Sequence, residues 1–263
     1  MDEPYEQLLR EMAIALDRLA TKVPPPQQVP FAGSFVFRYV ERTAQQAIVQ
    51  KLARIITGLR AALLLLRNGL VQEQGVIERV LDDLREDVMF LVYGILYCEL
   101  ENKWHKLFLE SFYEEEFDDP ESPFNSTQKR PTVPRQKIQA SIANIKGVVS
   151  NPSDRQEVAR TLAKAFSGFV HAASPQIMEM YGGNPPHFHV YGMLGTPRMP
   201  AHEKQIWYYF DRGITTFILA AGVFLDRELF DYLVSQKLKF ATATGRQPID
   251  IADFDELLKK KRS

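Results

Sequence analysis

The amino-acid sequence predicts an all-α protein built as a multi-helix bundle. Apolar residues recur at helical spacing along most of the chain, which is the pattern of amphipathic helices. Two segments, 88–98 and 213–225, are apolar nearly all round, so each needs other helices around it. Two proline-rich stretches, 118–134 and 181–201, lack this periodicity and are predicted to be loops.

The N-terminal region, residues 1–30, is predicted to be a helix followed by a proline-rich arm. The helix covers 5–22 and ends at three consecutive prolines, which remove backbone donors and fix an extended path. The aromatic stretch 29–37 is either an extended arm packed on the body or the lead-in to the next helix. That second helix is predicted over 38–67.

A single long helix over about 71–116 is predicted to be the centre of the bundle. Its first third is charged and its middle is apolar, so other helices are expected to surround the middle. Asn68 and Gly69 precede it and supply a helix stop or a short turn. We therefore expect it to form an antiparallel hairpin with the helix over 38–67.

The second half of the chain is predicted to complete one domain over 1–263. A chain of 263 residues is long enough to bury a substantial core within one large helical domain. The tail over 241–263 is predicted to contain one short helix with a basic end. The remaining predicted helices cover 135–149, 155–173 and 203–236.

Composition excludes several classes of protein. The chain has 32 basic and 33 acidic residues and a formal net charge of -1, so no global field attracts nucleic acid or an anionic membrane. Both apolar runs are shorter than the ~20 residues that span a bilayer, and we expect a soluble, cytoplasmic protein without a membrane partner. Cys98 is the single cysteine and is expected to be a small buried side chain. The phosphate-loop, dinucleotide, nucleophile-elbow and HExxH motifs are missing, so no cofactor is expected.

The first candidate site is the charged start of the long helix, with Arg79, Asp82, Asp83, Glu86 and Asp87. Arg79 and Asp83 are four residues apart and can form an ion pair, and Glu86 lies on the same side of the helix. Burial beside the apolar run would raise the pKa of these carboxyl groups, whereas pairing with Arg79 would lower it. The pattern fits either a solvated face with an internal ion pair or a functional site.

The second candidate site is the helix face formed by Lys164, Ser167, His171 and Ser174. Spacings of three and four residues place these side chains together, while Phe166 and its neighbours point to the core. A histidine one turn after a hydroxyl can act as an acid, a base or a hydrogen-bond donor. It can equally be a structural residue that bridges two helices.

The sequence SGFVHAAS resembles the terminal helix of HEPN-type helical domains, which carries Ser-x-x-x-His before small residues. The charged segment ERVLDDLRED followed by FLVYGI is similar to the helix that packs against it in those proteins. The resemblance covers roughly 55–115 and 155–175. It implies an α-helical bundle that is often a homodimer. Members of the family include toxin or defence ribonucleases as well as ligand-binding or interaction modules. The Arg-x4–6-His motif of the ribonucleases is absent, since Arg160 precedes His171 by eleven residues.

The resemblance assigns roles if the chain is a nuclease that cleaves a phosphodiester in RNA or a nucleotide. His171 would be the general acid or base, with Ser167 beside it, and Arg79 would stabilise the developing negative charge. Asp83 or Glu86 would orient the histidine or the arginine. In the competing interpretation, the same residues bridge helices in a bacterial stress or defence protein that is an interaction or ligand-binding module.

A third hypothesis concerns His187 and His189 in the second loop, with His202 downstream. In an extended segment, residues i and i+2 point to the same side, so these two imidazoles could share a metal ion. This pattern would suit a metal-dependent hydrolase. The flanking prolines and glycine also suggest a fixed loop that acts as a lid over the helical core.

Overall fold

The computed structural model describes residues 3–98, 102–119, 121–143, 161 and 166–249. Within these ranges the chain is mostly helical, and its strands form two small two-stranded sheets. The predicted all-α multi-helix bundle is therefore confirmed. Its main helices are α1 (Glu3–Ala20), α2 (Ala44–Arg67), α3 (Val71–Leu96), α8 (Met199–Val223) and α9 (Arg227–Ala243).

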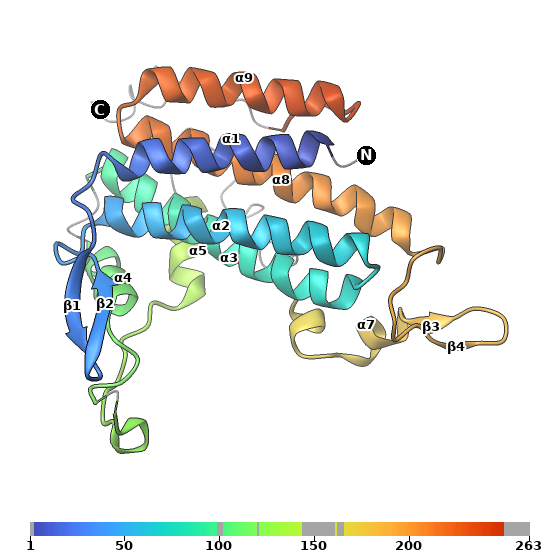
Figure 1. Cartoon of the computed structure of the whole chain (residues 1–263), viewed down its shortest axis with the longest axis horizontal. Helices are drawn as coiled ribbons and strands as arrows, with labels where there is room; N and C mark the ends of the chain where they lie inside the picture. Colours follow the sequence, from blue (N-terminus) through green and yellow to red (C-terminus); the bar gives the residue numbers. More distant parts are fainter. Residues whose placement is uncertain (1–2, 99–101, 120, 144–160, 162–165, 250–263) are drawn as a thin grey trace.

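The turn between α2 and α3 produces the predicted antiparallel hairpin (Figure 1). Gly69 has a φ of +69°, and a Cβ at this position would lie 2.6 Å from the backbone nitrogen of Met193. Only glycine fits such a close approach at a positive φ. The Met193 nitrogen in turn donates a 2.8 Å hydrogen bond to the Gly69 oxygen, so the turn also anchors the loop that precedes α8.

A β-hairpin occupies the segment between α1 and α2. Strand β1 (Gln27–Phe31) pairs antiparallel with β2 (Ser34–Arg38), and the turn residues Ala32 and Gly33 both have positive φ. This outcome favours the extended arm over the helical lead-in. It also shortens the helix predicted over 38–67, because α2 starts only after its N-cap, Thr43, which exchanges reciprocal hydrogen bonds with Gln46.

The predicted single helix over 71–116 is wrong in one respect, because the range contains two helices. Helix α3 ends at Leu96, Cys98 has a φ of +56°, and α4 (Lys103–Tyr113) starts after the N-cap Asn102. A continuous helix would be roughly 70 Å long and would extend beyond its neighbours. Folding back instead stacks the His105 ring on Phe90, 3.8 Å between centroids. Cys98 is exposed at the break, so its predicted burial is also wrong.

The centre of the bundle is shared and does not belong to α3 alone. Helix α8 packs against α1, α2, α3 and α9. It carries the apolar segment that starts at Gly213, and residues such as Phe210, Ile214 and Phe217 are fully buried. A helix that is apolar all round is stable only when it is enclosed, which explains this position. The apolar middle of α3 is also buried, as predicted, from Val88 to Tyr93.

The remaining elements lie around the bundle (Figure 1). Helix α5 (Arg135–Ala143) packs on α3, and the loop before it contains the 3-10 turn η2 (Pro123–Asn125). Helix α7 (Ser174–Met178) precedes β3 (Tyr181–Gly182) and β4 (His187–Phe188), and this small hairpin projects from one end of the molecule. It does not cover the helical core, in contrast to the predicted lid.

Several predicted features lie outside the described residues. They are Lys164, the last part of the helix over 135–149, the start of the helix over 155–173, and the basic end of the tail. In the part of the chain that the structure describes, no helix is long and apolar enough to cross a membrane.

Candidate functional site

The charged first third of α3 forms an ion-pair network with α5. Arg79 and Asp83 make the predicted i,i+4 pair, with 2.6 Å between Nη1 and Oδ1. Arg135 of α5 contacts the same Asp83 at 3.1 Å and Asp87 at 2.5 Å, and its Nη1 lies 3.7 Å from Glu86. Burial raises the pKa of Glu86, against the opposing effect of Arg135 and a hydrogen bond from Gln139.

A third helix joins this network from the other side of α3. Lys51 of α2 donates to Asp87 at 2.8 Å, and its ammonium lies 5.3 Å and 4.6 Å from the ring centroids of Phe108 and Phe112. The three carboxylates Asp83, Glu86 and Asp87 thus each face a cation from another helix or turn. The network ties α2, α3, α4 and α5 together.

The segment with Ser167 and His171 docks on the start of α3. The ring of Phe169 covers Gly75, and Gln72 donates a 2.7 Å hydrogen bond to the Gln176 oxygen. Phe166 packs edge-on to Tyr209 with 6.1 Å between centroids. The elements therefore meet on the side of α3 that also carries Arg79, as expected for helices packed in this way.

The side chains that the sequence predicts to be catalytic are less closely grouped. Ser167 is half-buried among the helical residues 166–170, and His171 is exposed in the turn that follows, next to Ala172 with a φ of +49°. Within the described ranges, neither side chain forms a hydrogen bond or ion pair with Arg79, Asp83 or Glu86. The roles assigned to these residues stay predictions.

A buried polar cluster between α3 and α8 was not anticipated from the sequence. Glu78 is fully buried and accepts hydrogen bonds from Gln74 at 2.8 Å and Gln205 at 2.6 Å. Burial raises the pKa of Glu78 to about 8. One turn later, Asp82 accepts 2.9 Å and 3.0 Å contacts from Tyr209 and Arg212.

This cluster leaves no room for a ligand. The adjoining cavity, lined by Asp82, Tyr209 and Arg212, has a volume of about 10 Å³. That is at most the space of one water molecule. The only sequence clue was a charged residue within the apolar pattern of α8, at Arg212, and such a residue in a buried helix needs a partner.

The histidines of the second loop do not form a three-ligand site. His187 and His189 lie side by side, with 4.4 Å between ring centroids, as their spacing predicts. His202 belongs to α8 instead, is buried, and has its Nε2 at 3.7 Å from Glu179. Burial lowers the pKa of His202, although Glu179 opposes this effect. The described residues contain no group of three or more His, Cys, Asp or Glu side chains suited to a metal ion.

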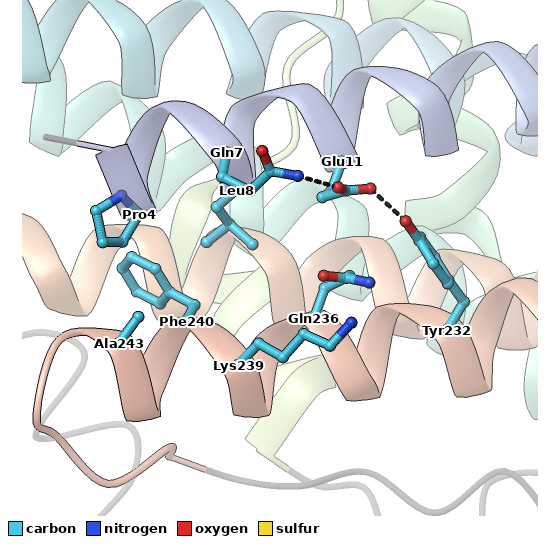
Figure 2. A pocket seen from close by; sticks show the side chains of 9 residues that line it. All are labelled: Pro4, Gln7, Leu8, Glu11, Tyr232, Gln236, Lys239, Phe240 and Ala243. Carbon is cyan, nitrogen blue, oxygen red and sulfur yellow. Dashed lines mark hydrogen bonds between the residues drawn. The ribbon is translucent and has the colours of Figure 1, made fainter.

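A pocket of about 390 Å³ lies between α1 and α9 (Figure 2). Both helices contribute residues spaced by three or four positions, so each helix presents one stripe to the space between them. The volume falls within the range of small-molecule sites, roughly 300–1,000 Å³. The lining residues are Pro4, Gln7, Leu8 and Glu11 of α1, and Tyr232, Gln236, Lys239, Phe240 and Ala243 of α9.

The two ends of this pocket differ in polarity (Figure 2). At one end, the buried carboxylate of Glu11 accepts hydrogen bonds from Gln7 and from the hydroxyl of Tyr232. This bond to Glu11 raises the pKa of Tyr232. At the other end, the ring of Phe240 is held by Tyr5 at 5.2 Å and by stacking on Trp207 at 6.0 Å, so it forms a rigid apolar wall.

Gln236 lies in the polar part of the pocket and has no hydrogen-bond partner among the described residues. Only 8% of its surface is exposed, yet its side-chain amide bonds to no residue that the structure describes. Lys239, one turn later, likewise has no ion pair within the described part of the chain. Neither amide atom of Gln236 is sealed from solvent, so both can bond to water or to a ligand in the pocket.

The sequence contained a weak indication of this pocket. Gln7 and Glu11 share a helix with Leu8 and Met12, and Gln236 sits between apolar residues of α9, but such residues are common at the edge of an apolar stripe. Comparison of the chain with protein-family models, curated proteins and solved structures found no match.

Proposed function

We propose that this chain is a HEPN-like helical protein that acts as a ligand-binding module, with the α1–α9 pocket as its binding site. The observation that carries the proposal is Gln236, a residue only 8% exposed whose amide points into a 390 Å³ pocket and bonds to no described residue. A bound ligand would supply the missing hydrogen bonds.

The rest of the pocket supports the same function. Lys239 adds an ammonium group without a counter-ion among the described residues. The fixed ring of Phe240 provides apolar surface that needs no rearrangement on binding. A few placed polar groups beside a rigid apolar wall are typical of small-molecule sites.

Cleavage of a phosphodiester has less support from the geometry. The Arg79 guanidinium already contacts Asp83, and the carboxylates around it face Arg135. The net charge of -1 also offers no broad attraction for RNA. A nucleotide as the ligand and a homodimer as the assembly remain suggestions of the HEPN resemblance alone.

Replacing Gln236 with leucine tests the proposal. We expect the free energy of unfolding of Gln236→Leu to stay within about 0.5 kcal/mol of wild type, because the amide bonds to no described residue. A panel of amino acids, nucleosides and short carboxylic acids should contain a class that raises the melting temperature of wild type but not of this variant.

The matched control is Gln45→Leu, a half-buried glutamine of α2 outside the pocket. It should respond to the panel as wild type does. The proposal fails if no member of the panel shifts wild type, or if Gln236→Leu keeps every shift. A variant that unfolds would show that the amide has a structural role, which also contradicts the proposal.

A further inference from the structure

We infer that the ligand of the α1–α9 pocket is a zwitterion, an α-amino acid with an apolar side chain. The inference rests on the proposed function and adds the chemical class of the ligand. It follows from the charges, the free hydrogen-bonding groups and the apolar wall of the pocket.

The pocket lining carries one side chain of each charge. Glu11 is the acidic residue and Lys239 the basic one, so the lining has no net charge but carries both signs. A simple anion would be repelled by Glu11, and a simple cation by Lys239. A molecule with both charges can meet each residue with the opposite sign.

The carboxylate of Glu11 is suited to a ligand ammonium group. Its two oxygens each accept one hydrogen bond, from Gln7 and Tyr232, and these two donors fix its position. A carboxylate offers about four acceptor sites, so sites remain for a cationic donor. Because only 7% of Glu11 is exposed, solvent screens this interaction weakly.

Gln236 and Lys239 are suited to a ligand carboxylate. Both side chains extend from α9 toward the end of the pocket where Glu11 and Tyr232 lie (Figure 2). The amide offers two N–H donors and the ammonium three, and neither group is used by another described residue. An α-amino acid places its ammonium and carboxylate on adjacent carbons, which allows both pairs of contacts at one end of the pocket.

The apolar end determines the preference for the side chain. Leu8 and Phe240 form the walls, and Pro4 and Ala243 lie beyond them (Figure 2). A leucine or phenylalanine side chain would be removed from water here, which contributes roughly 1.5–3 kcal/mol when burial is complete. A charged side chain would find no partner at this end of the lining.

Isothermal titration with three related probes tests the inference. L-phenylalanine carries both charges, 2-phenylethylamine lacks the carboxylate, and 3-phenylpropionate lacks the ammonium. We expect L-phenylalanine to bind at least ten-fold more tightly than either analogue. Lys239→Gln should weaken L-phenylalanine about ten-fold and bind 2-phenylethylamine no more weakly than wild type does, because a repelling charge is removed. Glu11→Gln should weaken L-phenylalanine and, for the same reason, bind 3-phenylpropionate no more weakly.

Lys204→Gln is the matched control, since Lys204 is exposed on α8 and outside the pocket. Should Glu11→Gln unfold, Tyr232→Phe replaces it, because loss of the hydroxyl frees the same carboxylate and should change only the affinity for ammonium-bearing probes. Equal binding of 3-phenylpropionate and L-phenylalanine would overturn the zwitterion while the binding site stands. If no amino acid, nucleoside or carboxylic acid of the earlier panel raised the melting temperature of wild type, both the zwitterion and the binding site would be overturned.

Discussion

Two buried side chains in this protein, Glu78 and Gln236, show how surroundings separate a structural residue from a candidate functional one. Both oxygens of Glu78 accept hydrogen bonds from neighbouring amides, and the cavity beside its cluster has the size of one water molecule. Gln236 is almost as buried, yet it faces a 390 Å³ pocket and bonds to no described residue. The hydrogen bonds that a side chain makes and the size of the cavity beside it distinguish the two roles better than burial does.

The raised pKa of Glu78 predicts a pH-dependent stability. Because burial raises the pKa to about 8, the folded protein keeps a proton that the unfolded chain releases near pH 4.5. Stability should therefore fall as pH rises from about 4.5 to 8 and then level off. Glu78→Gln removes this pH dependence. Its free energy of unfolding relative to wild type should therefore increase by up to roughly 4 kcal/mol between pH 4.5 and 8.

Urea unfolding of wild type and Glu78→Gln at pH 5 and pH 9 measures this difference. Glu73→Gln, an exposed glutamate of the same helix, should follow wild type at both pH values. Parallel curves for wild type and Glu78→Gln would contradict the prediction.

At the scale of elements, the contact between α3 and the segment 166–178 depends on a glycine. A Cβ on Gly75 would lie 2.7 Å from the ring of Phe169, so the segment can approach only because no side chain stands there. The hydrogen bond from Gln72 to Gln176 lies one turn away and holds the same surface. This docking uses the Phe169 side of the segment, and His171 stays exposed.

Gly75→Ala should therefore destabilise the protein, against the usual trend. Alanine within a helix is normally more stable than glycine by roughly 1 kcal/mol. Here the clash with Phe169 should outweigh that gain and cost about 1–3 kcal/mol, with faster hydrogen exchange in 166–178. Adding Phe169→Leu should relieve the clash, so the double variant should be no less stable than Phe169→Leu alone. A Gly75→Ala variant more stable than wild type would refute the expected clash.

At the scale of the whole molecule, an ion-pair cluster joins α1 to α9. Asp226 caps α9 through the Leu229 nitrogen and accepts two hydrogen bonds from Arg18 of α1, at 2.6 Å and 2.7 Å. Lys22 adds a third cationic contact at 3.1 Å. The cluster fixes α1 against α9, the two helices that form the walls of the pocket.

The low pKa of Asp226 predicts acid sensitivity of this connection. Burial alone would raise the pKa, but the hydrogen bonds from Arg18 and Leu229 and the contact with Lys22 outweigh it and lower the value to about 2. The resulting stability is complete above the unfolded pKa near 3.8 and is lost as pH falls through about 2. Asp226→Asn should cost roughly 2 kcal/mol at pH 7 and about half of that at pH 3.

Chemical denaturation at both pH values provides the measurement. Asp231→Asn is the matched control, because Asp231 is exposed on the same helix and, in the described part of the chain, pairs only with Arg227, at 3.6 Å. It should change stability by less than about 0.5 kcal/mol. A cost of Asp226→Asn that is the same at pH 7 and pH 3 would rule out the lowered pKa as its cause.

Local features of this protein could be predicted from the sequence. The helical spacing of apolar residues indicated the main helices, Asn68 and Gly69 indicated the turn of the α2–α3 hairpin, and the i,i+4 spacing indicated the Arg79–Asp83 pair. Each of these depends on residues a few positions apart, whose relative placement is set by the backbone of one helix or turn.

Only the tertiary structure decided the features that join distant segments. The break after Leu96 follows from the size of the bundle and from the packing of His105 on Phe90, and Arg135 completes the charge network from another helix. The pocket depends on contacts such as Tyr232 with Glu11, which are 221 residues apart. Periodicity within one helix shows which side chains share a face, but the helix that will lie opposite that face is determined by the packing of the whole chain.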